Sequence, residues 1–178
     1  IVASDECYTE IYFKEKPHSI LEFSKEGIVA FQSLSKRSAM TGYRIGWVAG
    51  DENIIAGFRK LKTNIDSGTP TFIQDAAVAA LKDDIHVEKM RKEYKQKRDI
   101  LVKALTSIGL EDCTPEATLY IWQRTPKNMN SVNFAKRLLQ KDIAVVVTPG
   151  ALLSTNFNGL NSGNDYVRFA LVPTIEET

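Results

Sequence analysis

The sequence has few of the residues from which metal sites and disulfide bonds are built. It contains two cysteines and two histidines among 178 residues. Cys7 and Cys113 lie far apart and match no metal-ligand spacing, and His18 and His86 are isolated from each other and from both cysteines. We therefore expect no metal site and a reduced, cytoplasmic setting.

Long apolar runs and an excess of one charge are also missing. No apolar run approaches the roughly 20 residues that a membrane-spanning helix requires. The 23 basic and 22 acidic residues leave a formal charge of +1, which predicts neither nucleic acid nor a membrane as a partner. The composition is 43% hydrophobic, which is enough to bury a sizeable core in one domain or two small ones.

The periodicity of apolar residues predicts strands that alternate with helices. Such alternation indicates an α/β or α+β layered arrangement. We place a domain boundary near residue 85, between residues 1–84 and residues 85–178. Residues 35–41 are polar and are predicted to be irregular. The predicted strands are 1–4, 27–33, 44–49, 118–123, 143–147 and 166–172, and the predicted helices begin at 51 and cover 72–81, 85–108 and 131–140.

Both ends of the sequence resemble interrupted elements. The chain begins inside an apolar run and has no initiator methionine. Near its end, Thr174 resembles a helix N-cap, with Glu177 three residues later as in a capping box. We expect the chain to be a piece of a longer protein, with the small domain truncated at its end.

Two polar segments directly follow predicted strands. Asp5 could hydrogen-bond a protonated ring nitrogen, and Tyr8 could reach a phenolic oxygen on the same ring, although aspartate also commonly begins a turn. After the next strand, Lys36 could form a Schiff base with an aldehyde, and the hydroxyls of Ser33 and Ser35 could donate to phosphate oxygens. The alternative for Lys36 is a surface lysine in a loop.

Two arginines suit anions. Arg44, eight residues after Lys36, could grip a phosphate dianion in a bidentate way, or could simply face solvent. Arg168 lies inside an otherwise apolar predicted strand, where an unpaired charge is costly, so it should meet a carboxylate. That carboxylate could belong to the protein or to a substrate.

Together these residues supply what a pyridoxal-phosphate enzyme acting on an amino acid requires. Their order and spacing resemble the C-terminal portion of the class I/II aminotransferases of fold type I. The resemblance covers essentially the whole chain. It rests on Asp5-x-x-Tyr8, Ser33-x-Ser35-Lys36, the stretch 33–47 with Arg44, and Pro149-Gly150 ahead of Tyr166-Val167-Arg168-Phe169.

The resemblance implies a role for each matching residue. Lys36 would hold pyridoxal 5'-phosphate as a Schiff base and move a proton between the amino acid and the cofactor, and Asp5 would keep the pyridine nitrogen protonated. Tyr8 would hydrogen-bond the cofactor's O3′. Ser33 and Arg44, joined by Ser35, would bind the phosphate, and Arg168 would hold the substrate α-carboxylate.

The resemblance also implies a fold and an activity. The chain would comprise the C-terminal part of the large cofactor-binding domain and a small α+β domain. The whole protein would be a homodimer that moves an amino group between an amino acid and a 2-keto acid, whereas the fragment alone would be inactive. Residues 114–122 are similar to succinyldiaminopimelate aminotransferases of lysine biosynthesis. The alternatives are a lyase or synthase on the same fold, or the sensor domain of a transcription regulator.

Overall fold

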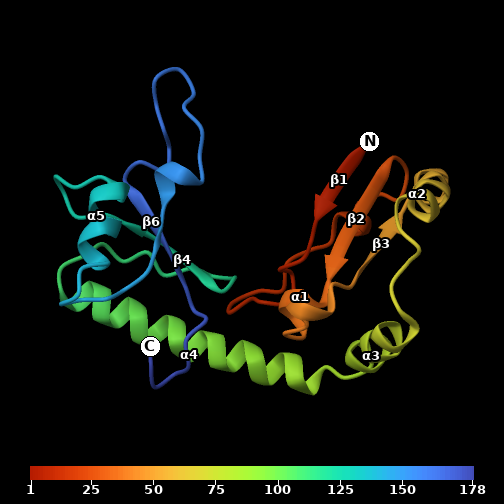
Figure 1. The fold of residues 1–178 in the computed structure, drawn as a ribbon, viewed down its shortest axis with the longest axis horizontal. Helices are drawn as coiled ribbons and strands as arrows, with labels where there is room; N and C mark the ends of the chain where they lie inside the picture. The colour runs from red at the N-terminus through yellow and green to blue at the C-terminus, as the bar shows by residue number, and fades with distance from the viewer. The chain divides into compact units, whose positions relative to one another are not determined.

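The computed structural model describes all 178 residues, which form two compact units (Figure 1). Unit 1 comprises Ile1–Arg91 and unit 2 comprises Lys92–Thr178. The boundary between them lies within helix α4 (Ile85–Ser107), near the start of that helix. Each unit contains its own three-stranded sheet. No helix combines the length and the apolar composition that are needed to cross a membrane.

The sheet of unit 1 brings three strand ends to one edge. It consists of β1 (Val2–Asp5), β2 (Ile28–Ser33) and β3 (Gly46–Gly50), in that order. Strands β1 and β2 are parallel, so both end at the same edge, whereas β3 is antiparallel to β2 and begins there. The register places Asp5 opposite Phe31 and Ser33 opposite Gly46. Residues after β1, after β2 and before β3 therefore meet at this edge.

Unit 1 also contains two longer helices and two short 3-10 helices. Helix α2 (Glu52–Ile65) begins where the Asp51 carboxylate accepts hydrogen bonds from the backbone N–H groups of Asn53 and Ile54. Helix α3 (Thr71–Leu81) follows Pro70. The short 3-10 helix η1 covers Ile20–Glu22, and the 3-10 helix η2 covers Thr41–Tyr43. A small core forms around Leu34, Met40 and Ala77.

Two predictions in unit 1 need correction. Residues 35–41, predicted to be irregular, contain the short helix α1 (Leu34–Arg37), because Ser33 caps it by accepting a hydrogen bond from the Ser35 N–H group. The strand predicted from residue 44 begins at Gly46 instead. Arg44 adopts a left-handed conformation with φ of 53°, which is incompatible with a strand.

Unit 2 packs one face of an antiparallel sheet against helices. Strand β6 (Tyr166–Ala170) lies between β4 (Tyr120–Arg124) and β5 (Thr148–Pro149). Helix α5 (Ser131–Leu138) begins at the N-cap Asn130, and the 3-10 helix η3 covers Gly150–Leu152. Six buried apolar residues form one cluster, namely Leu105, Ile121, Phe134, Val167, Phe169 and Leu171.

The strand predicted over residues 143–147 is absent, and in this part of the chain only the next two residues, Thr148–Pro149, pair with β6. Ala144 has a φ of 59°, and the N–H group of Val145 donates to the carbonyl of Leu138 at the end of α5. Residues 144 and 145 therefore form the turn that ends α5, and their backbone groups do not pair with a strand. A short run of β-branched residues reports apolar character but not which partner the backbone takes.

The predicted capping box near the end of the chain is confirmed. The Glu177 carboxylate accepts a hydrogen bond from the Thr174 N–H group at 3.0 Å, and the Thr174 hydroxyl accepts one from the Glu177 N–H group at 3.3 Å. Residues 175–177 form a turn there. Local sequence is sufficient for this motif because both partners lie within one turn.

Candidate active site

The edge at which β1 and β2 end and β3 begins collects six of the seven predicted site residues. Asp5 ends β1, and Tyr8 lies three residues beyond it. Ser33 ends β2, and Ser35 and Lys36 follow in α1. Arg44 lies two residues before β3. The seventh, Arg168, belongs to unit 2.

The surroundings of Asp5 favour its ionised form. Its Oδ1 atom accepts a hydrogen bond from the Cys7 N–H group at 3.1 Å, and hydrogen bonds from the thiol and the backbone of Cys7 lower the pKa of Asp5. Burial, with the adjacent carboxylate, raises the pKa of the Cys7 thiol to about 11. At neutral pH the pair is therefore an anion beside a neutral thiol. An anion suits a group that must hold a protonated ring nitrogen.

Three hydrogen bonds tie the segment from Ser33 to Arg44 into one loop around Lys36. The Ser35 N–H group donates to the Ser33 hydroxyl at 3.1 Å, and the Thr41 hydroxyl donates to the Ser35 carbonyl at 3.0 Å. The Arg44 guanidinium donates from Nη1 to the Thr41 carbonyl at 2.9 Å. The two serines and the arginine that were predicted to share a phosphate thus belong to one connected structure.

Arg37, which sequence reasoning did not single out, anchors this loop. Its side chain is 12% exposed and pairs with Asp84. It also donates to the carbonyl of Ala80 at 2.8 Å. The Ser38 hydroxyl lies 2.9 Å from Nε2 of His86. The residues after Lys36 are therefore fixed to the end of α3 and the start of α4, by contacts too distant in sequence for local patterns to reveal.

Arg44 is the most exposed of the predicted phosphate ligands. Its left-handed backbone is uncommon for a non-glycine residue and costs about 1–3 kcal/mol, a strain that clusters at ligand sites. Only one hydrogen bond, to Thr41, occupies its guanidinium. The other N–H donors make no hydrogen bond within the chain, so they could form a bidentate contact with an anion.

Arg168 lies on the face of the unit 2 sheet opposite the core. It occupies the central strand, opposite Trp122 on β4 and Thr148 on β5, while its neighbours Val167 and Phe169 are buried. Its guanidinium stacks over the Tyr120 ring at 4.4 Å from the centroid. Its Nε atom is buried without a hydrogen-bond partner, and no carboxylate of unit 2 pairs with it. A buried unpaired donor of this kind calls for an anion from outside the unit.

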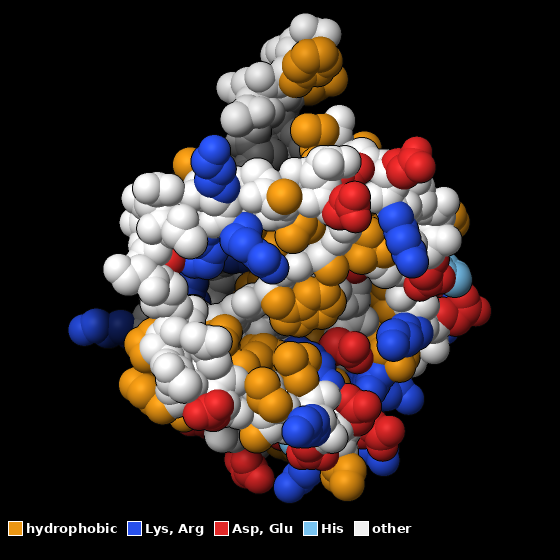
Figure 2. Space-filling model, turned by 90° about the vertical axis from the view of Figure 1, so that its right-hand side faces the viewer, with side chains coloured by type: hydrophobic (Ala, Val, Ile, Leu, Met, Phe, Trp, Pro, Cys, Tyr) orange, Lys and Arg blue, Asp and Glu red, His pale blue; other side chains and the backbone are white.

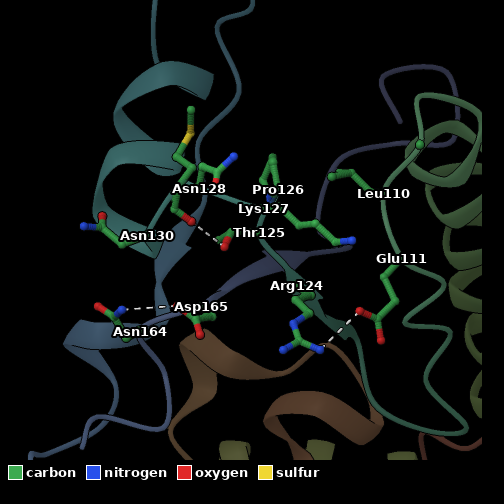
Figure 3. A pocket seen from close by; sticks show the side chains of 12 residues that line it. Leu110, Glu111, Arg124, Thr125, Pro126, Lys127, Asn128, Asn130, Asn164 and Asp165 are labelled. Atoms are coloured by element: carbon green, nitrogen blue, oxygen red, sulfur yellow. Dashed lines mark hydrogen bonds and ion pairs between the residues drawn. The ribbon is translucent and has the colours of Figure 1, made fainter.

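Unit 2 also contains a pocket of about 680 Å³ (Figure 3). Opposite charges line it, and Arg124 already contacts the carboxylate of Glu111 at 3.4 Å. None of the predicted site residues takes part. The lining residues are Gly109, Leu110, Glu111, Arg124, Thr125, Pro126, Lys127, Asn128, Met129, Asn130, Asn164 and Asp165. The candidate site therefore remains the edge of the unit 1 sheet, where six of the predicted residues lie.

Comparison with known proteins agrees with this geometry. Residues 1–176 match the family model described as aminotransferase class I and II. The chain is 41% identical over 177 residues to LL-diaminopimelate aminotransferase of Maridesulfovibrio salexigens, which covers 96% of this chain and 44% of that protein. The crystal structure of an aminotransferase from Neisseria meningitidis superposes with a TM-score of 0.91 and 37% identity, covering 99% of this chain and 46% of that one. A probable N-succinyldiaminopimelate aminotransferase from Thermus thermophilus gives a TM-score of 0.84 and 28% identity, covering 98% and 46%.

The chain belongs to the class I and II aminotransferase family. Its relatives in this family depend on pyridoxal phosphate, and the predicted fold class, the tail of a fold type I transferase with mixed α/β structure, is confirmed. The residues present fit that cofactor, because the edge joins an anionic Asp5, a lysine and an arginine with free donors. The chain spans about 44% of the length of the curated relative from Maridesulfovibrio.

Proposed function

We propose that the protein to which this chain belongs is a pyridoxal-phosphate-dependent aminotransferase, which exchanges an amino group between an amino acid and a 2-keto acid. The observation that supports this most is the convergence of Asp5, Lys36 and Arg44 at one edge of a sheet, although they come from three different strand ends. Residues 1–84 would then be the end of the large domain and residues 85–178 the small domain. The whole protein would be a cytoplasmic homodimer.

The residues at the edge divide the work of holding the cofactor. When bound, pyridoxal phosphate supplies an electron sink for the bond that breaks at Cα of the substrate. Lys36 would attach the cofactor and afterwards carry the proton between Cα and C4′. Asp5, which stays anionic, would hold the proton on the ring nitrogen, and Tyr8 would donate to O3′. Each role uses a group that sits at the edge of the sheet.

The phosphate would lie on the loop that contains Lys36. The Ser33 hydroxyl already accepts a hydrogen bond from the backbone, so its own proton can be donated to a phosphate oxygen. Ser35 lies in the first turn of α1, and Arg44 closes the loop through its contact with Thr41. A phosphate dianion would form charge-assisted hydrogen bonds with the exposed guanidinium.

Arg168 would bind the α-carboxylate of the substrate. Its unpaired Nε and its stacking on Tyr120 leave the edge of the guanidinium for a bidentate contact. The sequence alone left open whether a protein carboxylate or a substrate carboxylate meets this arginine. Because no carboxylate of unit 2 pairs with it, we assign it to the substrate.

For the substrate we infer a diaminopimelate-type amino acid. The relative that is 41% identical is named for LL-diaminopimelate, which is therefore the first substrate to test. The N-succinyl derivative is the second, since the Thermus thermophilus structure bears that name. Residues 63–66 contain no arginine that would bind a distal carboxylate. Both diaminopimelate substrates carry such a carboxylate, so this segment does not separate them.

The test uses the full-length protein loaded with pyridoxal phosphate. We expect a visible absorption band that glutamate or LL-diaminopimelate bleaches, and we expect Lys36→Ala to abolish the band while Lys25→Ala, an exposed lysine of the same unit, leaves it intact. Absence of a band in the wild-type protein would refute the assignment of Lys36. A band that neither amino acid changes would favour the lyase or the sensor domain. N-succinyl-LL-diaminopimelate in parallel separates the two substrates.

A further inference from the structure

Glu6 is the only acidic residue with a buried side chain, and it directly follows Asp5. It is 5% exposed, whereas Asp5 itself lies at the surface. A buried carboxylate normally requires a cation or several hydrogen-bond donors. No lysine or arginine pairs with Glu6, so its surroundings must supply the donors.

Three neutral groups from two other segments supply them. Oε1 of Glu6 accepts hydrogen bonds from the Ser19 hydroxyl at 3.1 Å and from the Ile20 N–H group at 2.9 Å. Oε2 accepts one from the side-chain amide of Gln32 at 3.1 Å. These are charge-assisted bonds, which are roughly twice as strong as neutral ones. They join the end of β1 to the start of η1 and to β2.

This network controls the direction of the neighbouring carboxylate. Successive side chains of an extended chain point to opposite faces, and Glu6 continues the ladder by donating its N–H group to the Phe31 carbonyl at 2.9 Å. With Glu6 held on one face, Asp5 is placed on the opposite face. Gln32 directly precedes Ser33 in β2, so the same network also sets the end of β1 against the strand that leads to Lys36.

We propose that Glu6 is a positioning residue that holds the Asp5 carboxylate in line with the ring nitrogen of the cofactor. The inference rests on the proposed function, because it concerns the same edge. Glu6 does not touch the cofactor. It acts through the backbone of β1, and its loss would leave the donors of Ser19, Ile20 and Gln32 without an acceptor.

The test compares Glu6→Ala with Glu6→Gln in the full-length protein. We expect Glu6→Ala to weaken pyridoxal phosphate binding about tenfold and to raise the pH midpoint of the visible band by about one unit, a typical size for the loss of one interaction. The midpoint rises because a less protonated ring withdraws fewer electrons from the nitrogen that Lys36 contributes. Glu6→Gln should stay within about twofold of wild type, because the Gln32 amide can flip to accept from it.

Melting of the cofactor-free protein separates positioning from stability. If Glu6→Ala lowers the melting temperature but leaves the pH midpoint at its wild-type value, Glu6 is only structural and the proposal is wrong. Should Glu6→Ala fail to fold, Gln32→Leu is measured instead, because it removes one hydrogen-bond donor to Glu6. A raised pH midpoint of its visible band supports the proposal, and an unchanged midpoint contradicts it. Glu26→Ala, an exposed glutamate of unit 1, is the control. A wild-type protein with no visible band refutes the proposed function, whereas normal binding with an unshifted Glu6→Ala refutes this inference alone.

Discussion

The two units of the molecule differ in how their buried apolar residues are clustered. Unit 2 gathers six buried apolar residues into one core, with eight partly buried ones packed against it. The largest buried cluster of unit 1 contains three, with three more against it. Large apolar residues of its helices stay open, among them Phe58, Leu61, Ile65 and Phe72. Figure 2, viewed from the side of α2 and α3, shows hydrophobic side chains gathered between charged ones.

The difference shows that the two units hold their candidate site residues in different ways. In unit 2 one arginine is presented by a strand whose opposite face is packed, so its position follows from the core. In unit 1 the candidate site residues lie at strand ends, in the short helix α1 and in the loop after it. Hydrogen bonds hold this segment together with the small cluster of Leu34, Met40 and Ala77. We expect unit 2 to be the more stable, and unit 1 to depend on further apolar contacts in the full-length protein.

The largest effects are expected from two substitutions, one in each unit, that should impair different steps of the proposed reaction. In the full-length enzyme, Lys36→Ala should abolish covalent attachment of the cofactor. Arg168→Ala should leave attachment intact but raise KM for the amino acid at least about 30-fold, since losing one partner of a charge pair costs 2 kcal/mol or more. Spectra and steady-state kinetics measure both. Arg124→Ala, an exposed arginine of unit 2, is the control. Loss of cofactor attachment in Arg168→Ala would contradict the assignment of cofactor binding to unit 1 and of substrate binding to Arg168.

The next effect concerns stability, and the two tryptophans report each unit separately. Trp47 lies in unit 1 and Trp122 in unit 2, so Trp122→Phe and Trp47→Phe isolate each signal. In urea we expect Trp47 to report the earlier transition. Ile121→Ala should cost about 2–5 kcal/mol, because Ile121 is fully buried.

Phe58→Ala is the matched change in unit 1. Phe58 is 38% exposed and its ring meets Phe31 edge-on, so its loss should cost less than about 1 kcal/mol. An equal cost for Phe58 and Ile121 would show that unit 1 is as well packed as unit 2, contrary to the comparison.

A smaller effect concerns acid. Hydrogen bonds from the N–H groups of Gly27, Ile54 and Asn53 lower the pKa of Asp51, the N-cap of α2. The stability that this carboxylate contributes is therefore present above its ordinary value of 3.8 and is lost as the pH falls through the lowered value. We expect Asp51→Asn to flatten the acid unfolding of unit 1, followed through Trp47.

The N-cap of α5 in unit 2 supplies the control for that experiment. Asn130 accepts the N–H group of Asn133 and carries no titrating group. Asn130→Ala should therefore destabilise unit 2 by a similar amount at pH 3 and pH 7, on the order of 1 kcal/mol. A strong pH dependence in Asn130→Ala would show that loss of a cap can depend on pH without a carboxylate. The pH effect of Asp51→Asn could then not be attributed to titration of Asp51.

The smallest effect is expected at the surface of unit 2. The Arg124–Glu111 pair is about half exposed on both sides, and its atoms lie 3.4 Å apart. Glu111→Gln should change the free energy of unfolding by less than about 1 kcal/mol, and salt should reduce the effect further. Urea titration at low and high salt measures it. A larger cost would show that the pocket beside this pair matters for the stability of unit 2.

The sequence predicted elements well wherever the deciding contacts are local. The start of a helix at Asp51 and the capping box at Thr174 each depend on partners within a few residues. The strand predicted over residues 143–147 was wrong because apolar character does not show where the N–H group of Val145 is used. Helix α1 was missed because four residues carry no periodicity.

The sequence by itself provided the candidate residues for the proposed chemistry, namely Asp5, Lys36, Arg44 and Arg168, from their types and their spacing. Only the tertiary structure decided how they are held. Parallel pairing of β1 with β2 brings two strand ends together across more than 20 residues. Glu6 meets Gln32 at a separation of 26 residues, and Arg37 meets Ala80 at 43. Local patterns register neighbours along the chain, whereas these hydrogen bonds form only after the chain has folded.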